Sequence, residues 1–362
     1  PLTHGLFLND VPLRTDSVSL AKELKSAGYD TACIGKWHID GHGRSNFIPR
    51  DRRQGFDYWK VLECTHAYNR SPYYADGPEK LFWEGYDAAA QTRDAQRYLA
   101  DPARQTKPFL LWLAWGPPHN PYETAPAKYR ERYAADRITL RPNVPPSHST
   151  PARAWLAGYY AHCTALDDLF GDLLTTLEQQ GLAENTIVIF TSDHGDMLGS
   201  QGERLKRKPW EESIRVPGIL RWPGHVKPGT RSDVFFTHVD FAPTLLGMAG
   251  VAVPKVMQGR DLSKPIVTGK GKGPDSAFFQ IFGPYAGDGT HGGWRGVRTA
   301  THKLIHYWKK DAWELFDLTK DPTEQRNLIN DPAQAPRIAE LKAELKRLQQ
   351  ELGDTGQFAN EI

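Results

Sequence analysis

The sequence predicts an α/β protein with a smaller C-terminal appendage, and three observations support this. Helical spacing alternates with short apolar runs over the first part of the chain, the usual grammar of α/β folds. The clearest strand patterns are continuous apolar or β-branched runs, typical of strands covered on both faces. After a Gly/Lys-rich stretch near residue 270, short strand patterns follow one another directly. We therefore expect two domains, residues 1–270 and 271–362.

The first domain is expected to open with a helix. Thr15 or Asp16 is the expected N-cap, apolar residues recur at helical spacing, and Gly28 ends the pattern. The later elements expected are a strand at 31–37, an irregular surface excursion over 40–86, a helix at 87–100, a buried strand at 109–115, a proline-rich loop over 116–150, a helix at 153–180, strands at 186–191 and 216–222, and a helix near 240–250.

In the second domain, four short and mutually antiparallel strands are expected before a helix. The strands are placed at 278–282, 297–299, 304–308 and 313–318, and the helix at 335–352. The helix is amphipathic, and its leucines (Leu341, Leu345, Leu348 and Leu352) are expected to dock on the small sheet.

Composition argues against several classes of protein. The formal net charge is +2, so bulk charge gives no reason to expect nucleic acid or an anionic membrane as partner. No stretch approaches the roughly 20 apolar residues of a membrane span. Three cysteines (Cys33, Cys64 and Cys163) are too few for a disulfide framework, and we expect Cys33 and Cys163 to be buried structural thiols.

Polar clusters follow the predicted strands, where open α/β sheets place ligands. Lys36 and His38 stand two residues apart in an extended segment, so both can face one anion. His119 lies between prolines that stiffen its loop. For each cluster the structural alternative stays open: a surface lysine with a hydrogen-bonded histidine in the first, and a structural histidine in the second.

Two further clusters lie downstream. Asp193 and His194 follow a β-branched strand, and Gly195 permits a turn that lets both side chains converge on a metal ion; a capping Asp is the alternative. The basic run 204–208 is compatible with a nucleic-acid patch, a solvated loop, or a lysine that faces the same anion as Lys36. A near-neutral chain favours the last two.

Taken in order, these clusters resemble the sulfatase family of the alkaline-phosphatase-like superfamily. The matching words are GKWH at 35–38, PPHNPY at 117–122, SDHGDMLG at 192–199, KRKPWEESIRVP at 206–217 and the tail ELFDLTKDPTEQRNL at 314–328. The resemblance implies a mixed sheet flanked by helices, with a small C-terminal antiparallel sheet plus helix.

The resemblance also implies roles for residues of this chain in sulfate-ester hydrolysis. Lys36 and Lys206 would contact sulfate oxygens, and His38 would orient the nucleophile. His119 would protonate the leaving alkoxide. Asp193 and His194 would supply half of a Ca²⁺ site, with Mg²⁺ as the alternative. The distance to Glu211 in the PWEES turn selects Lys206, with Lys208 next and Arg207 still open.

The chain departs from the family at one point. In such enzymes a cysteine in Cys-x-Pro/Ala-x-Arg becomes formylglycine, the nucleophile, and none of the three cysteines here has that setting. A pair of acidic metal ligands is missing as well. We therefore expect both in a segment before Pro1, and expect the 362-residue chain alone to be inactive and to leave a sheet edge unpaired.

The substrate is expected to be a small sulfate ester or, by preference, a sulfated glycan, because the loops 40–86 and 120–150 are rich in Arg, Tyr and Trp. A phosphoester or phosphonate hydrolase of the same superfamily is one alternative. A non-catalytic protein that binds sulfated glycans is another. The resemblance favours a periplasmic or secreted location, and the sequence leaves the oligomeric state open.

Overall fold

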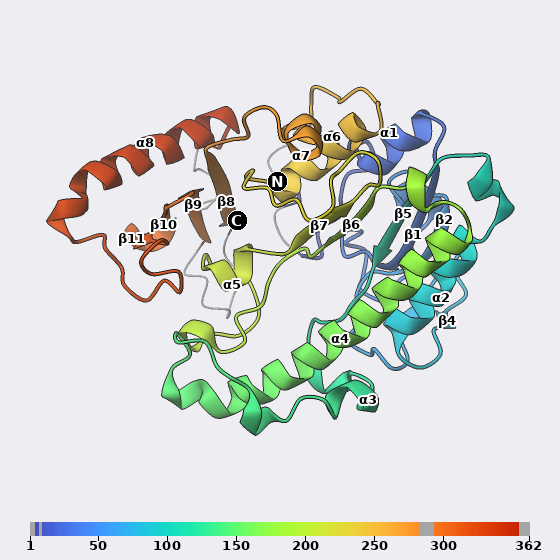
Figure 1. Cartoon of the computed structure of the whole chain (residues 1–362), viewed down its shortest axis with the longest axis horizontal. Coiled ribbons are helices and arrows are strands. Elements are labelled where there is room, and N and C mark those ends of the chain that lie inside the picture. Colours follow the sequence, from blue (N-terminus) through green and yellow to red (C-terminus); the bar gives the residue numbers. More distant parts are fainter. Residues whose placement is uncertain (1–3, 7–8, 283–292, 355–362) are drawn as a thin grey trace.

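A three-stranded parallel sheet lies at the centre of the first part of the chain (Figure 1). A computed structural model describes residues 4–6, 9–282 and 293–354. The middle strand, β1 (Asp30–Lys36), pairs in parallel with β2 (Tyr58–Leu62) on one side and with β5 (Phe109–Ala114) on the other. Since parallel strands end at the same edge, the segments after β1 and β5 meet there.

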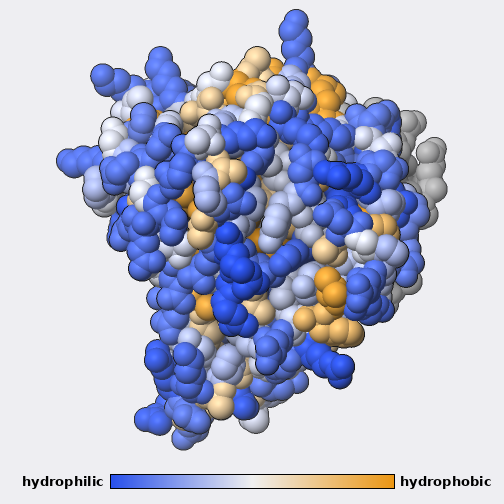
Figure 2. Space-filling model, turned by 90° about the vertical axis from the view of Figure 1, so that its right-hand side faces the viewer, coloured by the Kyte–Doolittle hydropathy of each residue, from blue (hydrophilic) through white to orange (hydrophobic). Residues whose placement is uncertain are grey.

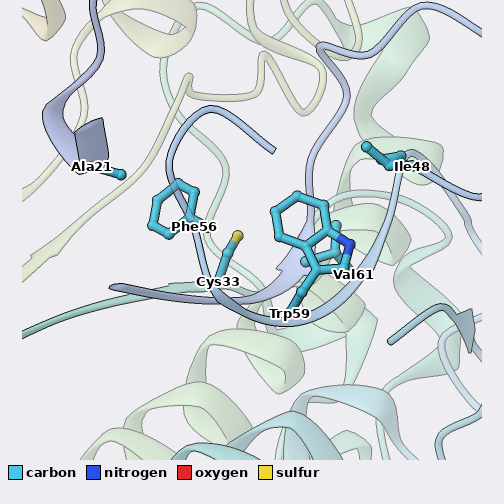
Figure 3. Close-up of a cluster of buried hydrophobic side chains, with 6 residues drawn as sticks. All are labelled: Ala21, Cys33, Ile48, Phe56, Trp59 and Val61. Carbon is cyan, nitrogen blue, oxygen red and sulfur yellow. The ribbon is translucent and has the colours of Figure 1, made fainter. Parts of the chain in front are cut away.

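Helices cover both faces of this sheet because alternate residues of β1 point to opposite sides. Cys33 packs with Ala21 of α1 (Leu20–Ser26), in the cluster drawn in Figure 3. Its neighbour Ile34 packs on the other face, among residues of α2 (Asp87–Leu99). The long helix α4 (Ser149–Gln179) lies against α2 on that second face.

A second sheet consists of β6 (Val188–Thr191) and β7 (Gly218–Arg221), which pair antiparallel. Helix α6 (His238–Met248) follows it and contacts α1. Among the described residues, β5 pairs only with β1, and β6 only with β7. We expected β5 to be a buried strand, but Trp112 in its middle is 46% exposed.

The C-terminal part is an antiparallel sheet with one covering helix, as predicted. Its strand order is β11-β10-β9-β8, and α8 (Ala335–Glu351) packs on it through Leu341, Leu345 and Leu348. The strands are β8 (Ser276–Phe282), β9 (Gly293–Thr299), β10 (His302–Tyr307) and β11 (Ala312–Asp317). The predicted Leu352 is the C-cap of α8 and only partly buried.

Short elements complete the described chain. They are β3 (Pro72–Tyr73), β4 (Leu81–Phe82), α3 (Ala127–Arg130), α5 (Glu211–Ile214) and α7 (Ser263–Thr268), with several single turns of 3-10 helix. Helix α7 ends shortly before residue 270, where we expected the domain boundary, and β8 begins shortly after it. The division at 270 stays a prediction. Buried ion pairs cross it, since Lys303 of β10 pairs with Glu211.

Three expectations about local structure were wrong. The N-cap of α1 is Ser19, whose hydroxyl accepts a hydrogen bond from Lys22 N, rather than Thr15 or Asp16. The segment 40–86 is not wholly irregular, since it contains β2, a strand of the central sheet. Its mixture of aromatic and charged residues did not give a recognisable strand pattern. Cys163 is only partly buried, whereas Cys33 is fully buried.

The surface carries no dominant apolar face on the side that Figure 2 shows. Hydrophobic residues form separate patches there, within a largely hydrophilic surface. Of the helices in the described parts of the chain, none has the length and apolar character needed to cross a membrane.

Candidate active site

The predicted site residues gather beyond the carboxyl ends of β1, β5 and β6. Lys36 is the last residue of β1, His119 follows β5, and Asp193 and His194 follow β6. β1 and β5 can lie this close because Gly35, with φ of 108°, has no side chain: an added Cβ would lie 2.1 Å from Ala114 O. Glycine is therefore required where the first of these segments leaves the sheet.

His119 is held as a neutral imidazole with a defined tautomer. Its Nδ1 lies 3.0 Å from the Asn120 carbonyl oxygen, so Nδ1 carries the hydrogen and donates it. Its Nε2 lies 2.5 Å from Lys206 Nζ, which donates to it. Burial and the charge of Lys206 lower the pKa of His119 to about 3.

Lys206 is presented by a tightly folded loop. The residues on either side of it, Leu205 and Arg207, have φ of 66° and 72°, in the left-handed region. Asp196 holds the loop, since its Oδ1 accepts from Leu205 N at 2.9 Å and its Oδ2 accepts from Tyr122 OH at 2.6 Å. Asp196 thus ties the Lys206 loop to the segment that carries His119, a role we did not predict.

Two lysine charges converge on this place, and the nearest carboxylate, that of Asp193, acts on Lys206 only through its charge and forms no salt bridge with it. Within the described residues, no Asp or Glu lies within salt-bridge distance of Lys36 or Lys206. Burial, followed by the charge of Lys36, lowers the pKa of Lys206 to about 8. Two nearby ammonium groups, one of which lowers the pKa of the other, are a favourable site for an anion.

The other two basic candidates point elsewhere. Lys208 is buried and pairs with Glu203 at 3.2 Å. Arg207 and Lys208 line a separate cavity of about 240 Å³ between their loop and the strands β9 to β11. The geometry therefore favours Lys206, which is the lysine that contacts His119.

His38 lies beside the same anion site, in a different electrostatic setting. Its φ is 61°, and its Nε2 is 3.7 Å from Asp10 Oδ1, while Arg44 binds both oxygens of Asp10. Burial and the charge of Lys36 lower the pKa of His38 to about 4, so the ring is neutral. Among the described residues, its buried Nε2 has no hydrogen-bond partner. That nitrogen is free to orient another group.

Asp193 and His194 face each other as a pair of lone-pair donors. His194 Nδ1 donates to Gly195 O at 2.7 Å, which leaves Nε2 as an acceptor 3.5 Å from Asp193 Oδ2. The Asp193 side chain is 76% exposed. Desolvation acts to raise its pKa, but His194, Lys36 and Lys206 outweigh this and lower it. A cation would relieve the contact between the two acceptor atoms.

These two residues fit a metal ion only in part. Ca²⁺ takes six to eight oxygen ligands, so a carboxylate and an imidazole are a fraction of the set. No group of three or more His, Cys, Asp or Glu side chains suited to a metal occurs in the described part of the chain. The remaining ligands would have to come from outside it.

One histidine at the site escaped the sequence analysis. His66, in the loop after β2, stacks on His119 with ring centroids 5.1 Å apart and planes 16° from parallel. The only local signal was its position in an aromatic loop that follows a strand. We did not recognise that strand, so nothing brought His66 to this edge of the sheet.

Fixed ammonium groups and imidazoles gathered at the strand ends of this fold are the arrangement expected of a hydrolase that acts on tetrahedral oxyanion esters. A model of the sulfatase family matches residues 1–251, and a model described as N-sulphoglucosamine sulphohydrolase, C-terminal, matches residues 199–351. The chain belongs to the sulfatase family, and it is a sulfuric ester hydrolase with the alkaline-phosphatase-like fold.

Individual relatives agree with this assignment. The chain is 40% identical over 358 residues to an ulvan-active sulfatase of Formosa agariphila, a match that covers 98% of this chain and 70% of that protein. A structure solved in complex with its substrate, D-glucosamine-2-N,6-O-disulfate, has a TM-score of 0.83 at 26% identity and covers 100% of this chain and 87% of that one. A phosphonate monoester hydrolase of Silicibacter pomeroyi, at 22% identity and a TM-score of 0.78, shares the fold and covers 98% and 84%.

Proposed function

We propose that this protein removes sulfate from a sulfated carbohydrate. The observation that carries the proposal is the convergence of two lysines without carboxylate partners, Lys36 and Lys206, on the neutral imidazole of His119. Ulvan and a disulfated glucosamine, which two relatives act on by name, support a carbohydrate as the carrier of the sulfate.

The side chains divide the chemistry between binding and proton transfer. Lys36 and Lys206 hold the sulfate oxygens, where negative charge grows as the S–O bond to the sugar breaks. His119 is the general acid for the departing sugar oxygen, and Nε2 is the atom that serves, because Nδ1 is committed to Asn120 O. Because Nε2 of the neutral ring carries no hydrogen, the proton first passes from the Lys206 ammonium group to Nε2 and from there to the sugar oxygen, which leaves Lys206 as a neutral amine until it takes up a proton from solvent.

The nucleophile lies outside the side chains described here. Burial raises the pKa of the thiols of Cys33 and Cys163, and none of the three cysteines has the setting that formylglycine formation requires. The free Nε2 of His38 is placed to orient a nucleophile that another segment supplies.

A divalent cation held by Asp193 and His194, Ca²⁺ or Mg²⁺, would polarise the sulfate oxygens when bound. In the full-length gene product we expect Ca²⁺ to bind with an affinity that Asp193→Asn lowers by at least about tenfold, since a carboxylate is a main ligand of this ion. Isothermal titration calorimetry measures it. Asp233→Asn, on an exposed loop, is the control and should leave binding unchanged. Equal affinity in both variants would remove Asp193 from the metal site.

The substrate assignment is tested by giving the full-length gene product a sulfated polysaccharide, its desulfated form and a phosphonate monoester. We expect sulfate release from the first, measured by ion chromatography, and loss of that release in Lys206→Ala by about two orders of magnitude or more. Faster turnover of the phosphonate would instead make the protein a phosphonate hydrolase, the reaction of one protein that shares its fold. Binding of the polysaccharide without release would indicate a glycan-binding protein.

A further inference from the structure

His66 is an exposed histidine that lies directly on an active-site group. Its ring stacks on that of His119, whereas His194 meets His119 nearly edge-on at a centroid distance of 6.1 Å. His119 is the proposed donor to the leaving oxygen, so whatever is bonded to that oxygen must lie near His119. A side chain that covers one face of His119 and reaches solvent is placed to meet it.

The loop that carries His66 is fixed at both ends. Before it, the buried Glu63 accepts hydrogen bonds from Asp40 N and Gly41 N, at 2.8 and 2.9 Å. After it, the buried Tyr68 donates from its hydroxyl to Asn120 O at 3.2 Å. Tyr68 also fills the space beside Gly116, where an added Cβ would lie 2.7 Å from its ring.

Because both ends are anchored, the tip of the loop has a defined position. Asn69 adds a second bond across to the His119 segment, from its amide nitrogen to Thr124 O at 3.2 Å. At the tip, Ala67 N donates to Thr65 Oγ1 at 3.1 Å, which closes a small turn around His66. An ordered, exposed side chain binds a ligand with less loss of conformational entropy than a mobile one.

The electrostatic setting keeps the His66 imidazole neutral. Partial burial, followed by the charges of Lys36 and Lys206, lowers its pKa. A neutral imidazole offers one donor and one acceptor nitrogen, which is the pattern that matches sugar hydroxyl groups. It would add little to the binding of the sulfate anion, which the two lysines already bind.

We propose that His66 is a substrate-contacting residue for the leaving group, which hydrogen-bonds a hydroxyl of the sugar ring that bears the scissile sulfate. The proposal rests on the proposed function, because it assumes that the ester carries a sugar. It separates the site into a sulfate-binding part, formed by lysines, and a part at His66 that recognises the carrier.

The test is carried out on the full-length protein with two ester substrates and with inorganic sulfate, the reaction product, as an inhibitor. One ester is a sulfated sugar; the other is an aryl sulfate, whose leaving group has no hydroxyls. We expect His66→Ala to lower kcat/KM for the sulfated sugar by about tenfold, through the loss of a hydrogen bond, and to change that for the aryl sulfate less than about twofold. The inhibition constant of inorganic sulfate should be the same in His66→Ala as in the unaltered protein.

Two further variants separate hydrogen bonding from stacking. His66→Phe keeps a ring against His119 and should lose the sugar substrate as His66→Ala does, whereas His66→Gln should retain part of the activity. His225→Ala is the matched control, since His225 is another exposed histidine stacked on a ring, that of Trp222, and lies outside the site. It should match the unaltered protein on both esters.

Other outcomes would overturn the inference in recognisable ways. An equal loss on both esters, or a weaker inhibition by sulfate, would mean that His66 only positions His119. Unchanged kinetics on the sugar would mean that His66 does not meet the substrate. If the unaltered protein releases no sulfate from any sugar but cleaves the aryl sulfate, the proposed function fails first, and the variants then report only on stacking.

Discussion

At the scale of single residues, the site depends on ionisation states that burial and like charges impose. His38 and His119 are neutral because desolvation and nearby lysines disfavour their charged forms. Lys206 suffers the same penalties but keeps a pKa of about 8, so it is still an ammonium group at neutral pH. Charged lysines beside neutral imidazoles place fixed positive charge where the hydrolysis of a sulfate ester develops negative charge.

The pKa of Lys206 predicts how sulfate binding depends on pH. The pKa lies below the ordinary 10.5, so the ammonium form is complete well below pH 8 and is lost as pH rises through it. The affinity for inorganic sulfate should therefore fall by up to about tenfold per pH unit above pH 8. In Lys206→Arg the fall should move beyond pH 10, since guanidinium stays charged. Calorimetry from pH 6 to 10 measures the affinity for sulfate in both proteins. An affinity that does not change up to pH 10 in the unaltered protein would contradict the role assigned to Lys206.

At the scale of elements, the loops that follow the strands are held by close backbone contacts. The segment after β6 lies directly against α5, where Gly195 N donates to Ser213 O at 2.9 Å. An added Cβ at Gly195 would lie 1.9 Å from Glu212 O, so the side-chain-free residue sets the distance between the two segments. The metal candidates and the end of the PWEES turn thereby keep a fixed relation.

Gly195→Ala should consequently destabilise the protein. The backbone oxygen it meets cannot move without shifting α5, and such overpacking costs about 1–3 kcal/mol of unfolding free energy. Gly218→Ala is the control, because no atom lies within 4 Å of a Cβ built there and its effect should stay within about 0.5 kcal/mol. Thermal unfolding followed by circular dichroism compares them, and equal midpoints would refute the close contact.

At the scale of the whole molecule, buried ion pairs join the C-terminal sheet to the active-site loop. Lys303 of β10 is fully buried and contacts Glu211 at 2.8 Å, Glu324 at 2.6 Å and Pro209 O at 3.0 Å. Glu211 also binds Arg298 of β9. Pro209 and Glu211 belong to the turn just after Lys206, so the small sheet supports the segment that presents Lys206.

Lys303→Met should therefore cost far more than the loss of a surface charge. The substitution leaves the Glu324 carboxyl group without its ammonium partner. Burial already raises the pKa of Glu324 to about 7. Breaking a buried pair costs about 3–5 kcal/mol, so we expect the melting temperature to fall by more than about 5 °C. Adding Glu324→Gln should restore part of the loss. Lys346→Met, exposed on α8, is the control. A melting temperature near that of this control would show that the ion pairs are dispensable.

The sequence by itself determined the parts of this protein that depend on local pattern. Periodicity placed α2, α4 and α8, and apolar runs placed β1, β5 and β6 within a few residues. The polar clusters after those strands gave the family, and with it the chemistry. These features are readable because helical spacing and buried strands leave a trace in the order of the residues.

Only the tertiary structure decided which of these residues meet. It singled out Lys206 from its basic neighbours through the contact with His119, brought His66 to the site from a distant position, and joined Asp196 to the distant Tyr122. It also showed β2 as a strand and Trp112 as exposed, both against expectation. Contacts between segments tens of residues apart depend on how strands and loops pack in space. Local sequence patterns do not show which distant segments will meet.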